Sequence, residues 1–383
     1  MAIKNNDNRK ALTGGAAIAE ALRQIGPDVM PVYPITPQTP IIETYAKFVA
    51  DGEADTEMIE VESEHSAISA AVGASAAGAR TVTATSSQGL ALMHEILYIA
   101  SGMRLPILMP VAARALASPI NIHGDHSDVM GARDAGWIQL FAENPQEAYD
   151  KTIIGMRLAE AAKLPVMVII DGFNTSHSVE NLEMLDGKAV KKFVGEYKAE
   201  KSLLDVANPV TFGSFALQDT FFEFKIEQEK AMAEALDQYR KIAKEYAAIS
   251  GREYSLFEKY ATKDADKILV MAGSAAGTTK DAIDELRAKG KKVGLIEIEL
   301  FRPFPRKELL KALSGAKEII VMDRAQSIGS NPPFYTEIVS AMHDSKKTGC
   351  DIRSFIYGIG GRDLFKSQII DLVNGKIKGK YLN

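Results

Sequence analysis

The chain has 383 residues, of which 46% are hydrophobic and 25% are charged, the composition of a folded globular protein long enough for two domains. Lys and Arg number 45 against 50 Asp and Glu, a net charge of −5 that is spread without long blocks of one sign. These values exclude a disordered or fibrous chain and give no electrostatic reason to expect nucleic acid or an anionic membrane as a partner.

In the first part of the chain, short β-rich runs alternate with segments whose apolar residues recur at helical spacing. This alternation predicts βαβ units and a largely parallel sheet. An opening helix is expected over residues 11–25, followed by strands at residues 29–35, 58–61, 81–85, 106–112, 137–141 and 165–170. Helices fill the gaps between them, so the sequence predicts one α/β domain here.

Two helix starts carry recognisable capping residues. Thr39 precedes Pro40, which places a capping hydroxyl before a proline suited to the first helical position. Asn144, followed by Pro145 and then by Glu147, repeats this arrangement and adds a capping-box pattern. Both patterns predict that a helix begins at these residues.

From about residue 176 to residue 262 strand signals become sparse, and we interpret this stretch as a helical connecting region of a first domain that spans residues 1–262. One charged helix in it carries an apolar stripe formed by Met232, Leu236, Tyr239, Ile242 and Tyr246. Such stripes usually face the local core, so packing on its own domain is favoured over an arm that grips a partner. The two interpretations are compatible.

Alternation resumes after residue 262 and predicts a second, smaller doubly wound α/β domain over residues 263–383. Its strands are expected at residues 268–272, 293–299, 318–323 and 352–357, with helices such as 279–289 and 307–313. The turn at residues 273–278 either presents its amides to an anion or is a tight turn in which Thr278 caps the following helix. The capped turn is favoured.

Several motifs with a defined chemistry are absent from the sequence, among them the P-loop, the dinucleotide-binding glycine fingerprint and the nucleophile elbow of hydrolases. The single cysteine, Cys350, excludes an intrachain disulfide framework. It also excludes an iron–sulfur cluster housed wholly in this chain, because a cluster needs about four thiolate ligands. The polar N-terminal sequence and the lack of a long apolar run predict a cytoplasmic protein without a membrane span.

A proline-rich segment follows the first predicted strand. Pro34, Pro37 and Pro40 make this segment stiff and hold Thr36 at the carboxyl end of the strand, where open α/β sheets bind their ligands. A rigid connector without a ligand explains the prolines equally well.

The next predicted strand ends at Val61-Glu62-Ser63-Glu64-His65 and leads into a helix, residues 66–79, that is composed almost entirely of Ala, Ser and Gly. A helix with so little bulk does not fill a core by itself, so we expect it to lie against another backbone, a cofactor or a second subunit. Glu64 either complements the dipole of this helix or is a buried acid aimed at a ligand atom.

Arg114 stands directly after another apolar strand, where its guanidinium either clamps a carboxylate or caps carbonyl groups at the surface. The loop behind it holds His123, Asp125, His126 and Asp128, in a chain with six histidines in all. These residue types bind divalent metals, but four ligands from one short loop rarely converge on one centre. A polar turn or an anion-binding loop is therefore favoured over a metal site.

Taken together, these motifs resemble the α subunit of the multi-subunit 2-oxoacid:ferredoxin oxidoreductases, most closely the pyruvate:ferredoxin oxidoreductase type. The resemblance rests on YPITP at residues 33–37, VESEHSA at 61–67, TSSQGLALM at 85–93, and GDHSD at 124–128 between Arg114 and Gly136-Trp137. FEFK at 222–225, FRPFP at 301–305 and GIGGRD at 358–363 match as well, so the resemblance covers almost the whole chain.

Members of this family convert a 2-oxoacid and coenzyme A to an acyl-CoA and CO2 with thiamine diphosphate, and pass electrons through iron–sulfur clusters to ferredoxin. The resemblance implies that the first domain is the pyrimidine-binding half of a thiamine diphosphate site, and that the second resembles the C-terminal domain of transketolase. It also implies that Glu64 hydrogen-bonds the aminopyrimidine ring and favours the imino form that takes a proton from the thiazolium carbon.

Carried over likewise, Thr36 and Arg114 hold the carboxylate and keto oxygens of the substrate, and Pro34, Ile120 and Ile122 line the space around the thiazolium. No metal ligand is expected in this chain, because the G-D-G motif with a following Asn that binds magnesium and diphosphate is absent. A β subunit is therefore expected to supply magnesium, the diphosphate half and a 4Fe–4S cluster. With γ and ferredoxin-like δ subunits it completes a complex, and the chain alone is expected to be inactive.

Pyruvate is the favoured substrate, with acetyl-CoA as the product. One alternative within the family is another 2-oxoacid, such as 2-oxoisovalerate or 2-oxoglutarate. A stand-alone thiamine-dependent decarboxylase or carboligase is a second alternative, against which the missing diphosphate motif argues. A third is a non-catalytic scaffold subunit, in which the small-residue helix and the apolar stripe are only docking surfaces.

Overall fold

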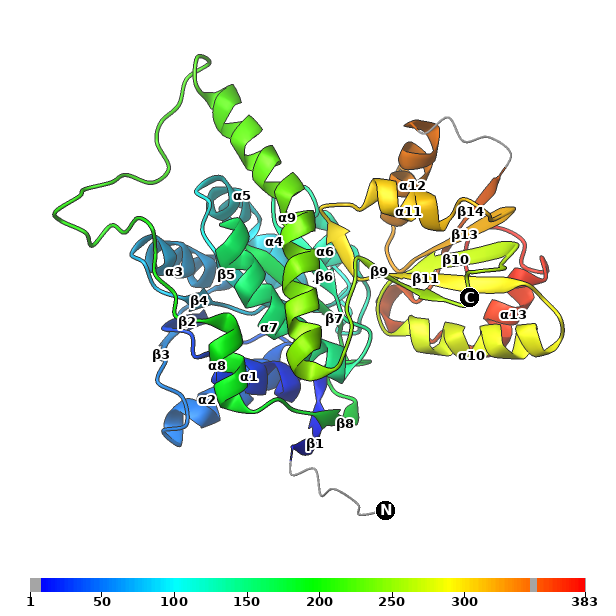
Figure 1. Ribbon diagram of the computed structural model, residues 1–383, viewed down its shortest axis with the longest axis horizontal. Helices are drawn as coiled ribbons and strands as arrows, with labels where there is room; N and C mark the ends of the chain where they lie inside the picture. The colour runs from blue at the N-terminus through cyan, green and yellow to red at the C-terminus, as the bar shows by residue number, and fades with distance from the viewer. Residues whose placement is uncertain (1–7, 345–349, 383) are drawn as a thin grey trace.

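The computed structural model describes residues 8–344 and 350–382, which fold into two α/β units that lie side by side (Figure 1). The larger unit is built on a seven-stranded sheet of order β12-β6-β7-β5-β4-β2-β3, and the smaller on a five-stranded sheet of order β14-β13-β10-β11-β9. A further two-stranded sheet pairs β1 with β8. The predicted α/β class with largely parallel sheets is confirmed.

All six strands predicted for the larger sheet are present and run parallel to one another. Their bounds are β2 Val29–Val32, β3 Glu57–Glu60, β4 Thr81–Val82, β5 Ile107–Ala113, β6 Ile138–Phe141 and β7 Val166–Asp171. The central strands β5 and β7 are buried along their whole length. Continuous burial explains why they are apolar throughout rather than alternating.

The helices that cover this sheet begin close to the expected positions. They are α1 Gly14–Ile25, α2 Thr39–Ala50, α3 Glu64–Ala76, α4 Ser87–Leu92, α5 His94–Gly102, α6 Ser127–Gly131 and α7 Pro145–Ala162. Asn144 caps α7 as predicted, because its side chain accepts a hydrogen bond from the Glu147 amide at 2.9 Å. Thr39 is not a cap: it is the first residue of α2, and Gln38 precedes it.

Two other local predictions are wrong at their edges. The helix expected from residue 11 begins at Gly14, because Arg9–Thr13 forms β1, which pairs antiparallel with β8 (Val179–Glu183). The strand expected over residues 81–85 is shorter in the structure, where β4 ends at Val82. The partner strand β5 contains Pro110, which has no N–H to donate, although the Thr85 amide still donates to the Pro110 carbonyl at 3.2 Å.

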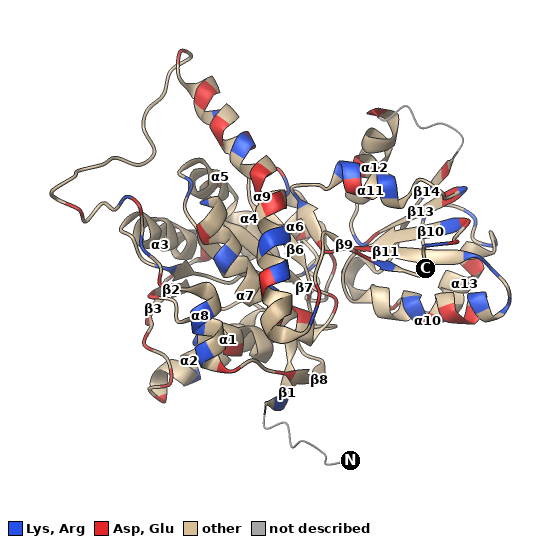
Figure 2. Ribbon diagram, viewed as in Figure 1, with Lys and Arg blue, Asp and Glu red and all other residues tan. Residues whose placement is uncertain are grey.

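The connecting region contains α8 (Gly187–Val194) and the 30-residue helix α9 (Phe221–Ser250). The C-terminal half of α9 packs on its own unit, where Tyr239, Ile242 and Tyr246 are buried. Its N-terminal half projects away from the sheet (Figure 1) and leaves Phe221 and Phe222 exposed. Figure 2 shows charged residues of both signs along this helix. Within the described residues, no helix is both long and apolar enough to cross a membrane.

The smaller sheet contains the four predicted strands, which are parallel, and an antiparallel edge strand that the sequence did not predict. The strands are β9 Phe257–Tyr260, β10 Lys267–Met271, β11 Val293–Ile298, β13 Glu318–Asp323 and β14 Asp351–Ile356. The helices are α10 Ala275–Ala288, α11 Arg306–Ala312, α12 Pro333–Asp344 and α13 Lys366–Val373.

One strand ties the two units together. β12 (Leu300–Arg302) follows β11 of the smaller sheet but pairs antiparallel with β6 at the edge of the larger one. In the other direction, β9 lies before residue 263 and yet belongs to the smaller sheet. The division into residues 1–262 and 263–383 therefore stays a proposal, and we use "first domain" and "second domain" for these two ranges.

Candidate active site

The carboxyl edge of the first-domain sheet gathers the polar residues that follow its parallel strands. Thr36 follows β2, Glu64 follows β3, Thr85 follows β4, Arg114 follows β5, and Asp171 ends β7. Because parallel strands all end at the same edge, side chains far apart in the sequence meet there. This edge is the position at which open α/β sheets bind ligands.

Arg114 and the Thr36 segment, which the sequence analysis placed at one site, are in direct contact. The Arg114 Nη1 donates to the Thr36 carbonyl at 2.8 Å, and its Nε donates to the Asn121 carbonyl at 2.8 Å. Arg114 therefore bonds carbonyl groups, as one of the two predictions stated. However, it is only 6% exposed, so it does not lie at the surface as that prediction expected. Burial lowers the pKa of its guanidinium. Among the described residues no hydrogen bond to Nη2 is found, which leaves that end available to an anion.

The Thr36 segment itself is held by Gln38. The Gln38 side chain accepts from the Ile35 amide at 3.3 Å and donates to the Ala84 carbonyl at 2.9 Å, which ties the proline-rich loop to the strand β4 side of the sheet. Gln38 is fully buried, whereas Thr36 is exposed. The loop therefore presents Thr36 to the outside of this chain from a rigid base.

Glu64 opens α3 and is 7% exposed. Ser63 before it is the N-cap, and its hydroxyl accepts from the Ser66 amide at 3.2 Å. The Glu64 carboxylate lies against Gly89, where an added Cβ would stand 2.7 Å from Glu64 Oε1 and 2.5 Å from Thr85 Oγ1. Gly89 is therefore needed for space, because any side chain there would displace the carboxylate.

The hydroxyl of Thr85 is buried and, among the described residues, has no hydrogen-bond partner. A buried polar group without a partner costs free energy, so such groups in proteins usually bond a ligand or an ordered water. No hydrogen bond from a described residue reaches the Glu64 carboxylate either. The pair forms a polar cradle next to Gly89 that suits a ring with both donor and acceptor nitrogens.

Pro34, Ile120 and Ile122 lie at the surface of this chain. Ile120 is 78% exposed and Ile122 is 43% exposed, and both belong to the loop between β5 and α6 that follows Arg114. The structure does not bring them against Glu64. Neighbouring exposed apolar side chains of this kind are found where proteins contact a partner or a ligand.

The four His and Asp residues of that loop bond to different partners and do not converge on one point. Asp125 accepts from the Gly360 amide at 3.0 Å, and the His126 Nε2 lies 2.6 Å from Asp171 Oδ1. His123 is exposed. The loop thus has the contacts of a polar turn, one of the two interpretations favoured over a metal site, and these contacts reach into the second domain.

Asp128, which the sequence analysis gave no role of its own, organises the strand ends beside the site. Its carboxylate accepts from the amides of Ser87 (2.7 Å) and Arg114 (3.0 Å). Burial raises the Asp128 pKa to about 7. Ser87 has a left-handed backbone with φ 49°, a conformation that costs free energy in a residue other than glycine. By accepting from both amides, Asp128 fixes the position of the start of α4 relative to the end of β5.

The turn at residues 273–278 binds an internal carboxylate. The amide and hydroxyl of Ser274 donate to Asp171 Oδ2 at 2.8 and 2.6 Å, and Arg324 Nη1 lies 2.7 Å from the same oxygen. The predicted capping role of Thr278 is wrong, because α10 begins at Ala275 and Thr278 lies inside it. Asp171 is the last residue of the buried strand β7, and Arg324 directly follows the buried strand β13. A charged residue at the carboxyl end of an apolar strand is a signal that could have identified both from the sequence.

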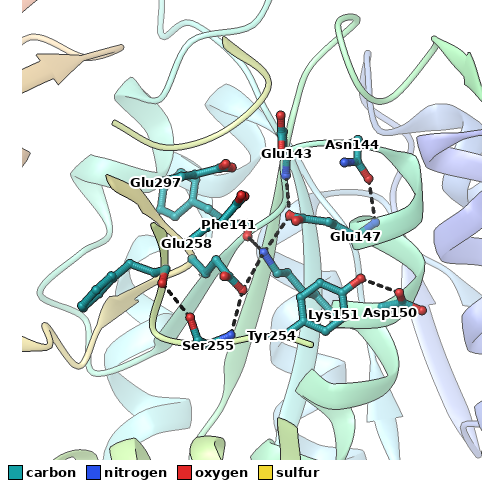
Figure 3. A network of polar contacts seen from close by, with 12 residues as sticks. Phe141, Glu143, Asn144, Glu147, Asp150, Lys151, Tyr254, Ser255, Glu258 and Glu297 are labelled. Carbon is teal, nitrogen blue, oxygen red and sulfur yellow. Dashed lines mark hydrogen bonds and ion pairs between the residues drawn. The ribbon is translucent and has the colours of Figure 1, made fainter. Parts of the chain in front are cut away.

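A second polar cluster lies between the two domains and is shown in Figure 3. Carboxylate oxygens of Glu143, Glu258 and Glu297 lie within 4.8 Å of one another, a spacing that suits a metal ion. However, the Lys280 ammonium is 2.8, 2.7 and 3.1 Å from these three carboxylates, so it occupies the position that a metal ion would take. Lys151 lies 2.8 Å from Glu147 in the same cluster. We therefore assign this cluster a structural role, which is to hold the two domains together.

Sequence profiles of two protein families match the chain. The first, described as pyruvate flavodoxin/ferredoxin oxidoreductase, thiamine diP-binding, matches residues 20–246, and the second, pyruvate:ferredoxin oxidoreductase core domain II, matches residues 265–369.

Curated relatives extend over nearly the whole chain. "Pyruvate synthase subunit PorA" of Thermotoga maritima is 52% identical over 96% of this chain and 95% of its own length. The protein of the same name from Methanocaldococcus jannaschii is 45% identical over 95% of this chain and 94% of its own. "Ketoisovalerate oxidoreductase subunit VorA" of Pyrococcus abyssi is 41% identical over 94% and 91%.

Solved structures share the fold. A 2-oxoglutarate:ferredoxin oxidoreductase from Magnetococcus marinus has a TM-score of 0.74 at 20% identity over 97% of this chain, which spans 66% of that longer chain. A split-gene transketolase has a TM-score of 0.57 at 10% identity over 96% of this chain and 98% of its own. The two profiles and the curated relatives show that this chain belongs to the pyruvate:ferredoxin oxidoreductase family.

Proposed function

We propose that this chain is the α subunit of a pyruvate:ferredoxin oxidoreductase, which converts pyruvate and coenzyme A to acetyl-CoA and CO2 and reduces ferredoxin. The observation that carries the proposal is the cradle of Glu64, Thr85 and Gly89, on the same sheet edge as the contact between Arg114 and the Thr36 segment. A carboxylate for a pyrimidine and a guanidinium for an oxoacid are the groups that this reaction requires from its pyrimidine-binding half.

The cradle fits the aminopyrimidine of thiamine diphosphate. When bound, this cofactor supplies the nucleophilic carbon that attacks a keto carbon. Glu64 would hold a proton between its carboxylate and a ring nitrogen, and the Thr85 hydroxyl would gain the partner that it lacks. Gly89 would let the ring approach both groups.

The Arg114 guanidinium would bind the substrate carboxylate through the end that carries Nη2, while Nε and Nη1 stay bonded to backbone carbonyls. The exposed Thr36 hydroxyl would donate to a substrate oxygen. Pro34, Ile120 and Ile122 would exclude water around the reacting carbon once a partner covers them, which accounts for their exposure in the single chain.

The rest of the site belongs to partners in this proposal. A β subunit would bind magnesium and the diphosphate and carry a 4Fe–4S cluster, because this chain has one cysteine and no diphosphate motif. A γ subunit and a ferredoxin-like δ subunit with further clusters would complete the complex and pass electrons to ferredoxin. A cytoplasmic location remains a prediction from the sequence.

A branched-chain 2-oxoacid is the second candidate substrate, since relatives named ketoisovalerate oxidoreductase subunit VorA are 41% and 42% identical to the chain. Pyruvate is favoured because the relative from Thermotoga maritima, named for pyruvate, reaches 52%.

The test is anaerobic purification of the native complex through a tag on this chain, followed by viologen reduction with coenzyme A and each of several 2-oxoacids. We expect partner chains to co-purify and reduction to require pyruvate and coenzyme A. A complex that is active only with 2-oxoisovalerate would overturn the substrate assignment, and a chain that purifies alone and without thiamine diphosphate would overturn the function.

A further inference from the structure

Asn121 lies between the candidate substrate arginine and the second domain. Its backbone carbonyl accepts from Arg114 Nε at 2.8 Å, and its side-chain Nδ2 donates to the Gly360 carbonyl at 3.0 Å. Its Oδ1 accepts from the His123 amide at 2.7 Å, which closes the loop around it. One residue thus touches the arginine with its main chain and the second domain with its side chain.

The second-domain side of this contact is a glycine turn. Gly360 and Gly361 have φ of 61° and 80°, in the left-handed region that favours glycine. A Cβ on Gly360 would stand 2.5 Å from Asn121 Nδ2, and one on Gly361 would overlap His123. The Gly360 amide also donates to Asp125 Oδ2 at 3.0 Å. Only glycine permits this close approach of the turn to the loop after Arg114.

The same loop is fixed to the second domain at its other end. The His126 amide donates to the Arg324 carbonyl at 2.9 Å, and the His126 ring bonds Asp171, which also accepts from Ser274. His126, Asp171 and Arg324 are each at most 3% exposed. The loop therefore has two anchors on the second domain, and Asn121 is the anchor next to Arg114.

We propose that Asn121 is a positioning residue through which the second domain orients the Arg114 guanidinium toward the substrate. Holding the Asn121 carbonyl in place fixes Nε, and the Thr36 carbonyl fixes Nη1, so Nη2 has one direction left. The inference rests on the proposed function, because it assumes that Arg114 binds the oxoacid. It gives the second domain, which holds none of the residues assigned to cofactor or substrate, a part in substrate binding.

The test compares purified complexes carrying Asn121→Ala, Gly360→Ala and, as a control, Asn374→Ala, an exposed asparagine of the second domain. We expect the first two variants to raise KM for pyruvate about tenfold, the effect of losing about one well-placed hydrogen bond, with KM for coenzyme A and kcat within about twofold. The control should match the wild type.

A double-variant cycle separates positioning from folding. In an Arg114→Lys background, Asn121→Ala should raise KM by less than twofold further, because the group through which it acts is already changed. An unchanged KM for pyruvate in Asn121→Ala, or an equally large effect in both backgrounds, would overturn the inference while leaving the proposed function intact.

The wild-type complex separates the two proposals. If it is active only with another 2-oxoacid, KM for that oxoacid replaces KM for pyruvate, and the same outcomes apply. If it reduces viologen with no 2-oxoacid, the proposed function fails and the inference fails with it.

Discussion

Asp171, the last residue of β7 in the first domain, accepts hydrogen bonds from both the amide and the hydroxyl of Ser274, the residue before α10 in the second. A serine at the start of a helix that follows a strand would ordinarily bind a ligand anion at the carboxyl edge of such a domain. Here a carboxylate of the neighbouring domain occupies that position. The second domain thus uses the carboxyl edge of its sheet to hold the first domain.

We expect Asp171→Asn to destabilise the protein by roughly 3–5 kcal/mol, because it leaves the Arg324 charge buried without its partner. Burial opposes ionisation, but Arg324 and His126 hold the pKa of Asp171 well below its usual range. The stability that the ionised carboxylate contributes is therefore complete above the ordinary carboxyl pKa and lost as the pH falls toward the lowered value.

Thermal unfolding of the complex between about pH 2 and 7 measures this effect, and Asp371→Asn, at an exposed ion pair with Lys376, is the control. Equal melting temperatures for Asp171→Asn and the wild type at neutral pH would contradict the anchoring role.

Glu64→Gln should reduce viologen reduction at least about 100-fold while the complex still assembles, because the amide does not hold the proton that the carboxylate would share with a pyrimidine nitrogen. The measurement is activity alongside size-exclusion chromatography of the tagged complex. Glu60→Gln, at an exposed glutamate of β3, is the matched control. Full activity of Glu64→Gln in an intact complex would favour the scaffold alternative.

Gly89→Ala should have a similar effect on activity for a steric reason. The new methyl group would stand 2.7 Å from Glu64 Oε1, so the carboxylate must move out of its cradle. Gly315→Ala adds the same methyl group where nothing lies within 4 Å, and we expect no loss there. Saturation binding of thiamine diphosphate to each complex gives a second readout, and unchanged affinity and turnover in Gly89→Ala would rule out the cradle.

Glu299, whose carboxylate lies 3.4 Å from the Lys151 ammonium in the polar cluster between the domains, predicts a pH dependence of opposite sign to that of Asp171. Burial is the main cause that raises the pKa of Glu299 to about 7, although Lys151 opposes it. The folded protein therefore binds this proton more tightly than the unfolded chain, and the associated stability is complete below the ordinary glutamate pKa and lost as the pH rises through about 7.

Between pH 5 and 8, Glu299→Gln should make the loss of folding stability with rising pH smaller by roughly 1–3 kcal/mol. Melting temperatures across that range check it, with the exposed Glu95→Gln as the control. A variant whose melting temperature falls as steeply as that of the wild type would show that Glu299 does not hold the proton.

The features that could be predicted from the sequence are those that depend on a local pattern of residues. The β5 and β7 runs were recognisable because strands buried on both faces are continuously apolar, and Asn144 because a cap needs only its next three residues. The family resemblance placed Arg114 and Thr36 at one site, and the structure joins Arg114 to the Thr36 carbonyl.

What the sequence did not reveal depends on contacts between distant segments. β12 has three residues and forms only because β6, some 160 residues earlier, offers an edge. The role of Ser274 depends on Asp171, and that of Asn121 on a turn 239 residues away. Sequence periodicity carries no information about such distant pairings. Thr278 was predicted to be a cap because the sequence does not show that Asp171 lies beside the turn.

The projecting half of α9 carries the last prediction. Phe222 is 67% exposed on a helix segment that leaves the first domain, and burial of a phenylalanine contributes about 2 kcal/mol or more when a partner covers it. We therefore expect Phe222→Ser to weaken co-purification of the partner chains at least about tenfold without lowering the melting temperature of this chain. Phe365→Ser, at a phenylalanine of the second domain that is 60% exposed, is the matched control. If both variants retain their partners equally in quantitative pull-downs at increasing salt, the arm does not grip a partner, and α9 serves only the packing that its buried C-terminal half already shows.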